Sequence, residues 1–192
     1  IGNYAFSGCV NISSVTIPSS VTTIGTQAFF GTSLSSIIVP KNVISIGNGA
    51  FAGCANLASI AVEEGNTSYK SVDNNLYTIS GNNLLQYAVA NSQTTFTVPD
   101  GVVQISSYSF FGCLALESVT LAESVMGIGS YAFGGCENLT AVTFKHMSNW
   151  RRSTDPGSDA TVNIADVRIA SPSTMAKYLT QEYADKSFFR LI

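Results

Sequence analysis

The residues that could carry nucleophilic or metal chemistry are four cysteines and one histidine. They are Cys9, Cys54, Cys113, Cys136 and His146. A zinc site needs ligands in closely spaced groups, whereas no two of these cysteines are near each other in the chain and no second histidine accompanies them. A Cys-His or Ser-His site would have to use His146, which follows Lys145 and has no acidic neighbour. We therefore predict no metal, no cofactor and no catalytic residue, and we do not expect an enzyme.

The four cysteines occupy one position of a repeated pattern, so we predict that they are small, buried, unpaired thiols in the turns of a repeating structure. The alternative for Cys113 and Cys136 is a disulfide bond between adjacent units, whose Cα atoms would lie ~5 Å apart. The carboxylates form no calcium loop. The stretch from Asp73 to Tyr77 lacks the glycine and the distant glutamate that such a loop needs.

Charge is scarce in this chain of 192 residues. Only 11 % of them are Asp, Glu, Lys or Arg, compared with roughly 25 % in an average soluble domain. Residues 1–144 contain seven acidic residues and two basic ones, Lys41 and Lys70, whereas residues 145–192 contain five acidic and seven basic residues. No basic stripe could bind a phosphate backbone, so nucleic acid is not expected as a partner. The hydrophobic content of 45 % excludes disorder, and no apolar run approaches the roughly 18 residues of a membrane span.

An internal repeat organises the first three quarters of the chain. A hexamer of the form Ile-Gly-x-x-Ala-Phe, degraded in its fourth copy, recurs at nearly equal intervals that are broken by one longer interval. Its copies begin at Ile1, Ile24, Ile46, Ile105 and Ile128. Most copies are followed by a Gly-Cys pair, an Asn and a strand-like Val-x-Ile stretch. Such a period predicts a solenoid, in which each unit buries its apolar side only by stacking on its neighbours.

The unit around residues 34–53 indicates how one coil would fold. Ile37 and Val39 alternate with Ser36 and Ile38, so a strand there would point the first pair inward and the second pair outward. The phenylalanine of each hexamer would point to the centre of the coil. We predict one buried column of stacked rings, formed by Phe6, Phe29, Phe51, Phe110 and Phe133.

The long interval between Ile46 and Ile105 contains one longer unit, at about residues 63–98, that lacks the Phe-Gly-Cys block. Two β-leaning runs, 71–79 and 84–89, flank a Ser-Gly-Asn-Asn sequence at 80–83, and this pattern predicts a β-hairpin. Three tyrosines fall in this unit, and they either pack in its framework, which we favour, or form an aromatic binding patch. They are Tyr69, Tyr77 and Tyr87.

The period ends after the last coil, so we place the solenoid at residues 1–146 and a capping segment at residues 147–192. A short strand is predicted at 162–169, and Pro172 would open a helix over residues 172–186. One face of this helix would carry Met175, Leu179 and Tyr183. An open solenoid end needs a non-repeating cover, and this segment would provide it.

The repeated pattern I-G-x-x-A-F-x-G-C-x-N-L-x-x-V-x-I-P resembles the BspA-like leucine-rich repeat family of bacterial and protozoan surface proteins. The longer unit resembles that family's irregular repeat, N-x-x-Y-x-S-x-D-G-x-L-Y, with Asn74 where the family has Gly. The matching residues are Asn66, Tyr69, Ser71, Asp73, Leu76 and Tyr77. The departures from the regular pattern are Thr32 for Cys, Ser106 for Gly, Ser109 for Ala and Ala122 for Pro.

The resemblance covers about residues 1–150 and implies a strand-rich, α/β-type leucine-rich-repeat solenoid. This right-handed solenoid would have units of about 22–23 residues, one irregular unit that contains a hairpin, and a non-repeat C-terminal cap. The family also implies surface display and adhesion without catalysis, but it assigns no ligand-contacting residue. The chain begins within a unit, so we expect it to be a fragment or a processed product. Three glycosylation sequons would matter only in a source that glycosylates secreted proteins; they begin at Asn11, Asn66 and Asn138.

Two functions remain open. The first is a monomeric secreted or cell-surface protein that binds a host or extracellular-matrix protein, or a glycan, through the outward side of its strands. The second is a structural spacer that displays another domain, which is favoured by the small, nearly uncharged outward side chains, because binding hot spots are usually Trp, Tyr or Arg. The expected binding surface consists of Ser36, Ile38, Ser59, Ala61, Ser118 and Thr120.

Overall fold

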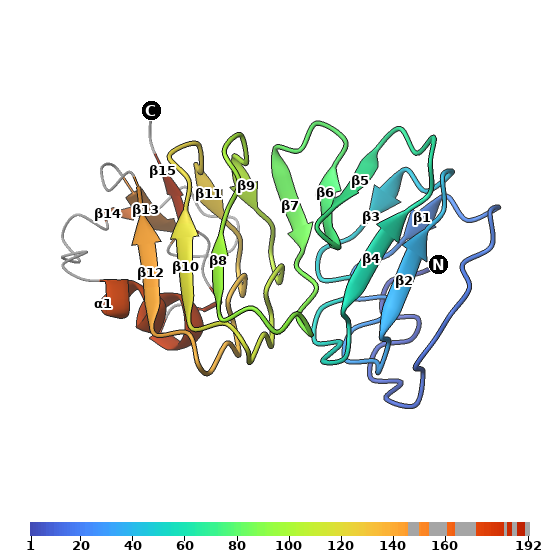
Figure 1. The fold of residues 1–192 in the computed structure, drawn as a ribbon, viewed down its shortest axis with the longest axis horizontal. Coiled ribbons are helices and arrows are strands. Elements are labelled where there is room, and N and C mark those ends of the chain that lie inside the picture. Colours follow the sequence, from blue (N-terminus) through green and yellow to red (C-terminus); the bar gives the residue numbers. More distant parts are fainter. Residues whose placement is uncertain (146–149, 154–160, 164–171, 183, 186–187, 191–192) are drawn as a thin grey trace.

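The computed structural model describes residues 1–145, 150–153, 161–163, 172–182, 184–185 and 188–190. Residues 1–145 wind into a solenoid that is elongated along the stack of coils (Figure 1). One row of strands forms the front face: β2 (Ser36–Val39), β4 (Ser59–Val62), β8 (Thr95–Thr97), β10 (Ser118–Leu121) and β12 (Ala141–Phe144). A second row contains β1 (Thr23–Ile24), β3 (Ser45–Ile46), β9 (Gln104–Ile105) and β11 (Gly127–Ile128). The predicted strand-rich solenoid is therefore confirmed.

The alternation predicted for one coil is present in β2. Ile37 and Val39 are buried, whereas Ser36 is exposed and 58 % of the surface of Ile38 is accessible. Parallel pairing of β2 with β4 places Ile37 beside Ile60 in register, so like residues stack from coil to coil. Each buried aliphatic side chain of this kind contributes about 1.5–3 kcal/mol relative to an exposed one. Stacking therefore supplies the core that a single coil lacks.

The aromatic rings form two stacks, and not the single column that the repeat predicted. One stack contains Phe6, Phe29 and Phe51, and the other contains Tyr87, Phe110 and Phe133. Neighbouring centroids within the stacks lie 4.7–5.8 Å apart. Tyr87 of the irregular unit thus takes the place of a phenylalanine. The surface of Phe6 is 37 % exposed, because no ring of the described residues covers its outer side, and the other four phenylalanines are buried.

Backbone hydrogen bonds join the turns of successive coils, and in each bond the N–H of one coil donates to a carbonyl of the next coil. We call this set of bonds the back-turn ladder. The N–H groups of Tyr4, Phe6 and Gly8 donate to the carbonyl oxygens of the next coil at residues 26, 28 and 30, at 2.7–2.9 Å. The coils pack closely beside this ladder. A Cβ atom on Gly47 would lie 2.3 Å from the backbone nitrogen of Thr26, which explains why glycine occupies this position.

The irregular unit is a three-stranded antiparallel meander of β5 (Tyr69–Val72), β6 (Asn75–Thr78) and β7 (Asn83–Gln86). Pairing of β6 with β7 confirms the predicted hairpin around residues 80–83. The run 71–79 is not a single strand, however. Asp73 and Asn74 have positive φ angles of 49° and 66° and reverse the chain between β5 and β6. Positive φ at both central residues is typical of the tightest hairpin turns.

The meander divides the solenoid into an N-terminal block (residues 1–62) and a C-terminal block (residues 95–145). In the front face, β2 and β4 form one parallel sheet and β8, β10 and β12 form another (Figure 1). The free side of β4 binds the meander, because the N–H of Ile60 donates to the carbonyl of Asn74 at 3.0 Å. The back-turn ladder is interrupted at the same place, where the rings of Phe30 and Phe111 meet at 5.4 Å. The buried apolar residues accordingly form two clusters.

The C-terminal segment packs against the last coil. It contains β13 (Trp150–Ser153), β14 (Thr161–Asn163), α1 (Pro172–Lys177), a π-helix (Tyr178–Glu182) and β15 (Phe188–Arg190). Helix α1 contacts β12, and β15 pairs antiparallel with β11. Met175 and Leu179 are buried in the core of the C-terminal block. Residue 183 and most of the predicted strand 162–169 lie outside the described residues.

Candidate functional site

The six residues of the expected binding surface lie on the front face in two separate patches. Ser36, Ile38, Ser59 and Ala61 form the N-terminal patch, in which Ser36 pairs with Ser59 and Ile38 pairs with Ala61. Ser118 and Thr120 form the C-terminal patch on β10, between β8 and β12. The two patches are not continuous, because the meander occupies the side of β4 where a further parallel strand would pair.

Three of the four cysteines are buried in the turns, as predicted, whereas Cys9 is exposed on the first coil. The thiols of Cys54 and Cys136 donate to the carbonyl oxygens of Phe29 and Phe110, each at 3.1 Å. Burial raises the pKa of the Cys54 thiol and raises that of Cys136 to about 12. A protonated, enclosed thiol is a poor nucleophile and a poor metal ligand. All four cysteines are free thiols in the structure.

Two departures from the repeat have a structural account. Thr32 stands where other coils have cysteine, and its hydroxyl donates to the same carbonyl of Phe29 at 3.0 Å. Ser109 stands where other coils have alanine and is completely buried. Its hydroxyl and that of Tyr87 have no hydrogen-bond partner among the described residues. Thr32 in place of cysteine therefore keeps the hydrogen bond to the Phe29 carbonyl. Ser109 in place of alanine buries a hydroxyl without a partner, which costs the free energy of its desolvation.

The residues that match the irregular motif are part of the framework. Tyr69, Tyr77 and Tyr87 are all buried, so the packing interpretation is confirmed and the aromatic patch is not. The amide of Asn66 donates to the carbonyls of Pro40 and Val43 and accepts from two backbone N–H groups, of Ser68 and Tyr69. Asn66 is 7 % exposed, so this sequon holds two coils together and is unsuited to carry a glycan.

No group of three or more possible metal ligands occurs in the part of the chain that the structure describes. His146, the residue on which a Cys-His or Ser-His site would depend, lies outside that part. No helix among the described residues is long and apolar enough to cross a membrane.

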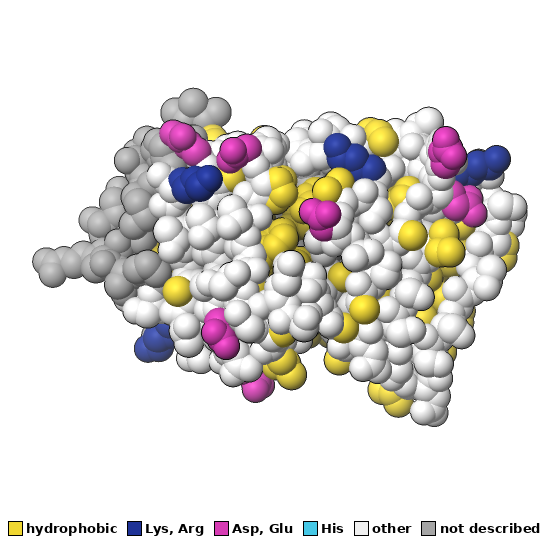
Figure 2. All heavy atoms as spheres, viewed as in Figure 1, with side chains coloured by type: hydrophobic (Ala, Val, Ile, Leu, Met, Phe, Trp, Pro, Cys, Tyr) yellow, Lys and Arg dark blue, Asp and Glu magenta, His cyan; other side chains and the backbone are white. Residues whose placement is uncertain are grey.

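The sequence did not reveal a hollow of about 190 Å³ between the meander and the loop that follows β8. Its walls include Lys70 and Val72 of β5, Tyr77 of β6 and the loop 99–102. Figure 2 shows hydrophobic side chains exposed in the middle of the front view, between the two blocks. Residues 72 and 102 are far apart in the chain, so no local pattern could have indicated that they share a cavity.

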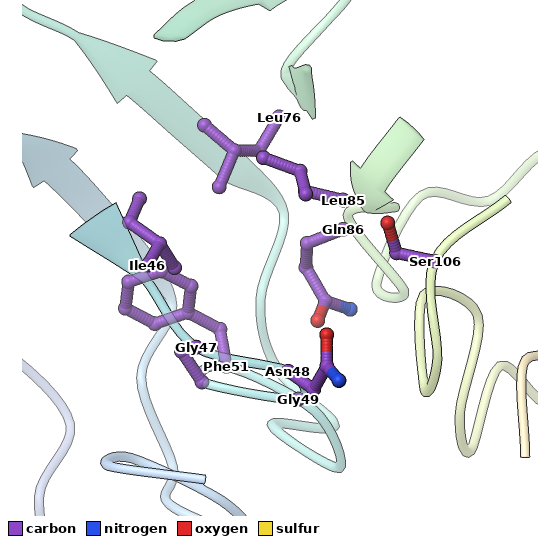
Figure 3. Close-up of a pocket in the computed structure, with 10 residues that line it drawn as sticks. Ile46, Gly47, Asn48, Gly49, Phe51, Leu76, Leu85, Gln86 and Ser106 are labelled. Atoms are coloured by element: carbon purple, nitrogen blue, oxygen red, sulfur yellow. The ribbon is translucent and has the colours of Figure 1, made fainter. Parts of the chain in front are cut away.

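A second cavity, of about 10 Å³, lies in the break between the blocks. The side-chain amides of Asn48 and Gln86 point toward each other there (Figure 3). Gln86 donates from Nε2 to the carbonyls of Tyr87 and Ser109, at 3.0 Å each. The cavity has room for about one water molecule and none for an organic ligand. Ser106 borders it, which explains why this coil tolerates a side chain where Gly47 and its counterparts have none.

Short coils of nearly constant length, built from parallel strands with a leucine- and isoleucine-lined core, define a leucine-rich-repeat solenoid. The BspA type leucine rich repeat region matches the chain in six copies, over residues 1–87 and 82–154. The chain belongs to this family. Leucine-rich repeats of this kind are generally non-enzymatic, and the family supports a repeat protein of the protein-interaction type. No curated protein matches the chain.

Three solved structures share the fold. A leucine rich cell surface protein from Faecalibacterium prausnitzii is 36 % identical with a TM-score of 0.69, over 74 % of this chain and 38 % of that chain. The pneumococcal vaccine antigen PcpA is 29 % identical with a TM-score of 0.70, over 74 % and 36 %. A leucine-rich repeat protein from Eubacterium ventriosum is 26 % identical with a TM-score of 0.65, over 74 % and 44 %. The chain thus spans less than half the length of these relatives.

Proposed function

We propose that this chain is part of a protein displayed outside the cell that binds a host or extracellular-matrix protein through its front face. The family and the similarity to a cell surface protein of Faecalibacterium prausnitzii support display at the surface. The repeat family supports a protein of the protein-interaction type, and the exposed strand face gives such a protein an extended surface for contact.

The observation that carries the proposal is the exposure of Ile38. It is 58 % exposed in a strand whose other outward residue is a serine, and it pairs in register with the small Ala61. It also lines a shallow hollow of about 120 Å³ together with Val15, Ile17 and Pro40. A large aliphatic side chain in that setting supplies apolar contact area, and the small neighbours add little side-chain entropy cost on binding.

A single copy of this face should bind weakly, because the N-terminal and C-terminal patches contain no Trp, Tyr or Arg to act as a hot spot. Display of many copies would compensate, since linked sites raise avidity by about 10²–10⁴ without any new contact. The spacer function is the second candidate. Small outward residues such as Ser36, Ser59 and Ser118 support it, because a surface of this kind contacts many molecules weakly and none tightly.

The test is binding of the chain, immobilised at high density, to a panel of purified host matrix proteins and their deglycosylated forms. We expect Ile38→Glu and Ala61→Glu to abolish binding. Ile44→Glu is the matched control, because Ile44 is 62 % exposed and lies outside the front-face strands. Binding that survives both front-face changes would overturn the proposed face. Loss of binding on deglycosylation would assign the partner to glycans, and an absence of binding at every density would favour the spacer.

A further inference from the structure

We propose that the hollow between the meander and the loop after β8 binds one apolar side chain of a protein partner, with an adjacent carboxylate of that partner held by Lys70. This inference rests on the proposed function, because it supplies the anchor that the small residues of the front face lack. Hot spots in protein interfaces are side chains buried in well-packed pockets.

The dimensions of the hollow fit a side chain. Its volume of about 190 Å³ is below the ~300–1,000 Å³ of pockets for drug-sized molecules. The exposed apolar part of the lining comes from Val72, which is 40 % exposed, and from Pro99 on the opposite wall, where Val102 lies buried beneath the surface. An aliphatic group that enters there displaces water from apolar surface on both sides, which favours binding.

The wall formed by the meander is held by its own hydrogen bonds. The Oδ1 atom of Asn82 accepts from the hydroxyls of Thr78 and Ser80, at 3.0 and 2.6 Å. The carbonyl of Asn82 in turn accepts from the N–H groups of Val103 and Gln104, at 2.7 and 3.0 Å. These last two bonds join the turn of the meander to the residues that directly follow the loop 99–102, which forms the opposite wall of the hollow.

The opposite wall, the loop 99–102, is fixed in a similar way. The hydroxyl of Ser124 accepts from the N–H of Gly101 at 3.0 Å and donates to the carbonyl of Val102 at 2.8 Å. Both walls are therefore positioned before any partner arrives. A preformed pocket lowers the ordering cost of binding, so more of the contact energy appears as affinity.

The positive charge of Lys70 determines which group of the partner binds next to the apolar side chain. Lys70 is half-buried against Gly81 at the edge of the hollow, and within the described part of the chain it forms no ion pair. Asp100 on the other wall already lies 3.9 Å from Lys145. Residues 1–144 contain only one other basic residue, Lys41. A carboxylate of the partner can therefore form an ion pair with the ammonium group of Lys70.

The lining favours a protein partner over a sugar. Among the described residues, Tyr77 is the one aromatic residue in the lining, and it is 3 % exposed, so its ring offers no open face for a sugar to stack on. Val72 and Pro99 contribute exposed apolar surface where a sugar would need hydrogen-bond partners for its hydroxyls. An aliphatic side chain needs none.

The experiment titrates the ¹⁵N-labelled 192-residue chain with three capped tripeptides: acetyl-Glu-Leu-Gly-amide, its Gln-Leu-Gly analogue and its Glu-Ala-Gly analogue. We expect acetyl-Glu-Leu-Gly-amide to shift the amide signals of Gly81 and Gly101. The Gln analogue should bind about threefold more weakly, the loss of one exposed ion pair. The Ala analogue should bind about tenfold more weakly, because it no longer buries most of a leucine side chain away from water.

Two variants, Lys70→Gln and Val72→Ser, locate the effect, and Lys41→Gln is the control. Lys70→Gln should remove the preference for the Glu peptide over the Gln peptide, whereas Lys41→Gln should leave it unchanged. Val72→Ser should reduce the preference for Leu over Ala, and dispersed amide spectra of each variant establish that it is folded. Equal binding of the three peptides, no shift at Gly81 and Gly101, or shifts with N-acetylneuraminic acid in place of the peptides would each overturn the proposal. A failure here with Ile38-dependent capture of a matrix protein intact would reject the pocket and retain the proposed face.

Discussion

The thiol of Cys54 donates a hydrogen bond to the carbonyl oxygen of Phe29, 3.1 Å away on the preceding coil. The thiol of Cys136 repeats this relationship with Phe110, and the hydroxyl of Thr32 reaches the Phe29 carbonyl from its own coil. At three copies of this repeat position a small donor thus reaches a buried carbonyl of a stacked phenylalanine, whereas the thiol of Cys113 donates to the carbonyl of Val89 at 3.7 Å. Cysteine and threonine can both occupy this position because each donates a hydrogen bond, so a sulfur atom is not required there.

The first prediction concerns thiol reactivity. At pH 8 under native conditions, iodoacetamide should modify the exposed Cys9 rapidly and leave Cys54, Cys113 and Cys136 unmodified, because burial raises the pKa of these three thiols. Mass spectrometry after a time course measures this. Denaturation of an untreated sample without reductant should give four free thiols, whereas a count of two would contradict the structure and point to a Cys113–Cys136 disulfide.

The second prediction concerns alkaline unfolding. Burial raises the pKa of Cys136 from 9.0 to about 12, and burial, with a smaller effect of Asp73 on Tyr77, raises the pKa of Tyr77 and Tyr87 from 10.0 to about 12. The folded state then holds these protons more tightly than the unfolded state, so their stabilising contribution is complete below pH 9 and is lost as the pH approaches 12. Urea titrations should give a constant free energy of unfolding from pH 7 to 9 and a falling one above. Cys136→Thr, which retains a donor as Thr32 does, should make the fall shallower.

The third prediction compares two phenylalanines of the same stack. Phe51→Ala should lower the free energy of unfolding by about 3–5 kcal/mol, because it leaves a cavity in the core of the N-terminal block. Phe6→Ala should cost clearly less, since Phe6 is 37 % exposed and stacks on Phe29 alone. Urea denaturation followed by circular dichroism measures both. Equal costs would contradict the assignment of Phe6 to the open end of the stack.

The fourth prediction tests close packing between coils. Gly47→Ala places a methyl group 2.3 Å from the backbone nitrogen of Thr26 and should cost about 1–3 kcal/mol. Gly2→Ala changes the same position of the first coil, where no atom lies within 4 Å, and should leave the thermal midpoint almost unchanged. Comparable midpoints for the two variants would show that the coils separate more easily than the structure indicates.

The fifth prediction is a stabilising change. Ser109→Ala removes a buried hydroxyl without a partner among the described residues and restores the alanine of the other coils, so it should raise the free energy of unfolding by about 1 kcal/mol. Tyr87→Phe removes the second such hydroxyl and should act in the same direction. A loss of stability in either variant would mean that the hydroxyl is hydrogen-bonded in solution.

Much of one coil could be predicted from the sequence. The alternation at Ile37 and Ile38 determines which side chains enter the core, and the recurring phenylalanine determines the ring stacks, because both depend on spacing within one unit. The turn at Asp73 and Asn74 was missed although the resemblance offered a signal there, an Asp-Gly pair in the irregular repeat. Asn replaces Gly in this chain and also tolerates positive φ, so the turn persists without its most familiar residue.

The division of the front face and the hollow were beyond local patterns. Equal repeats on both sides of the irregular unit predict one continuous sheet, and only the hydrogen bond from Ile60 to Asn74 reveals that the meander takes the edge of β4. The hollow forms because Val72 and Val102 are brought together by that same arrangement. Both features depend on how the longer unit folds back, which its length alone did not specify.

The back-turn ladder gives the molecule a polarity. Every N–H of the ladder points toward the following coil, so the outer edge of the first coil presents the carbonyl oxygens of Asn3, Ala5 and Ser7, which accept no backbone hydrogen bond from the described residues. Two such edges brought together would oppose oxygen to oxygen and repel. At the opposite end, the N–H of Tyr131 is already bonded to the carbonyl of Ala184. A coil that packs against the edge of Asn3, Ala5 and Ser7 must therefore present backbone N–H groups to it, in the orientation that the ladder already has.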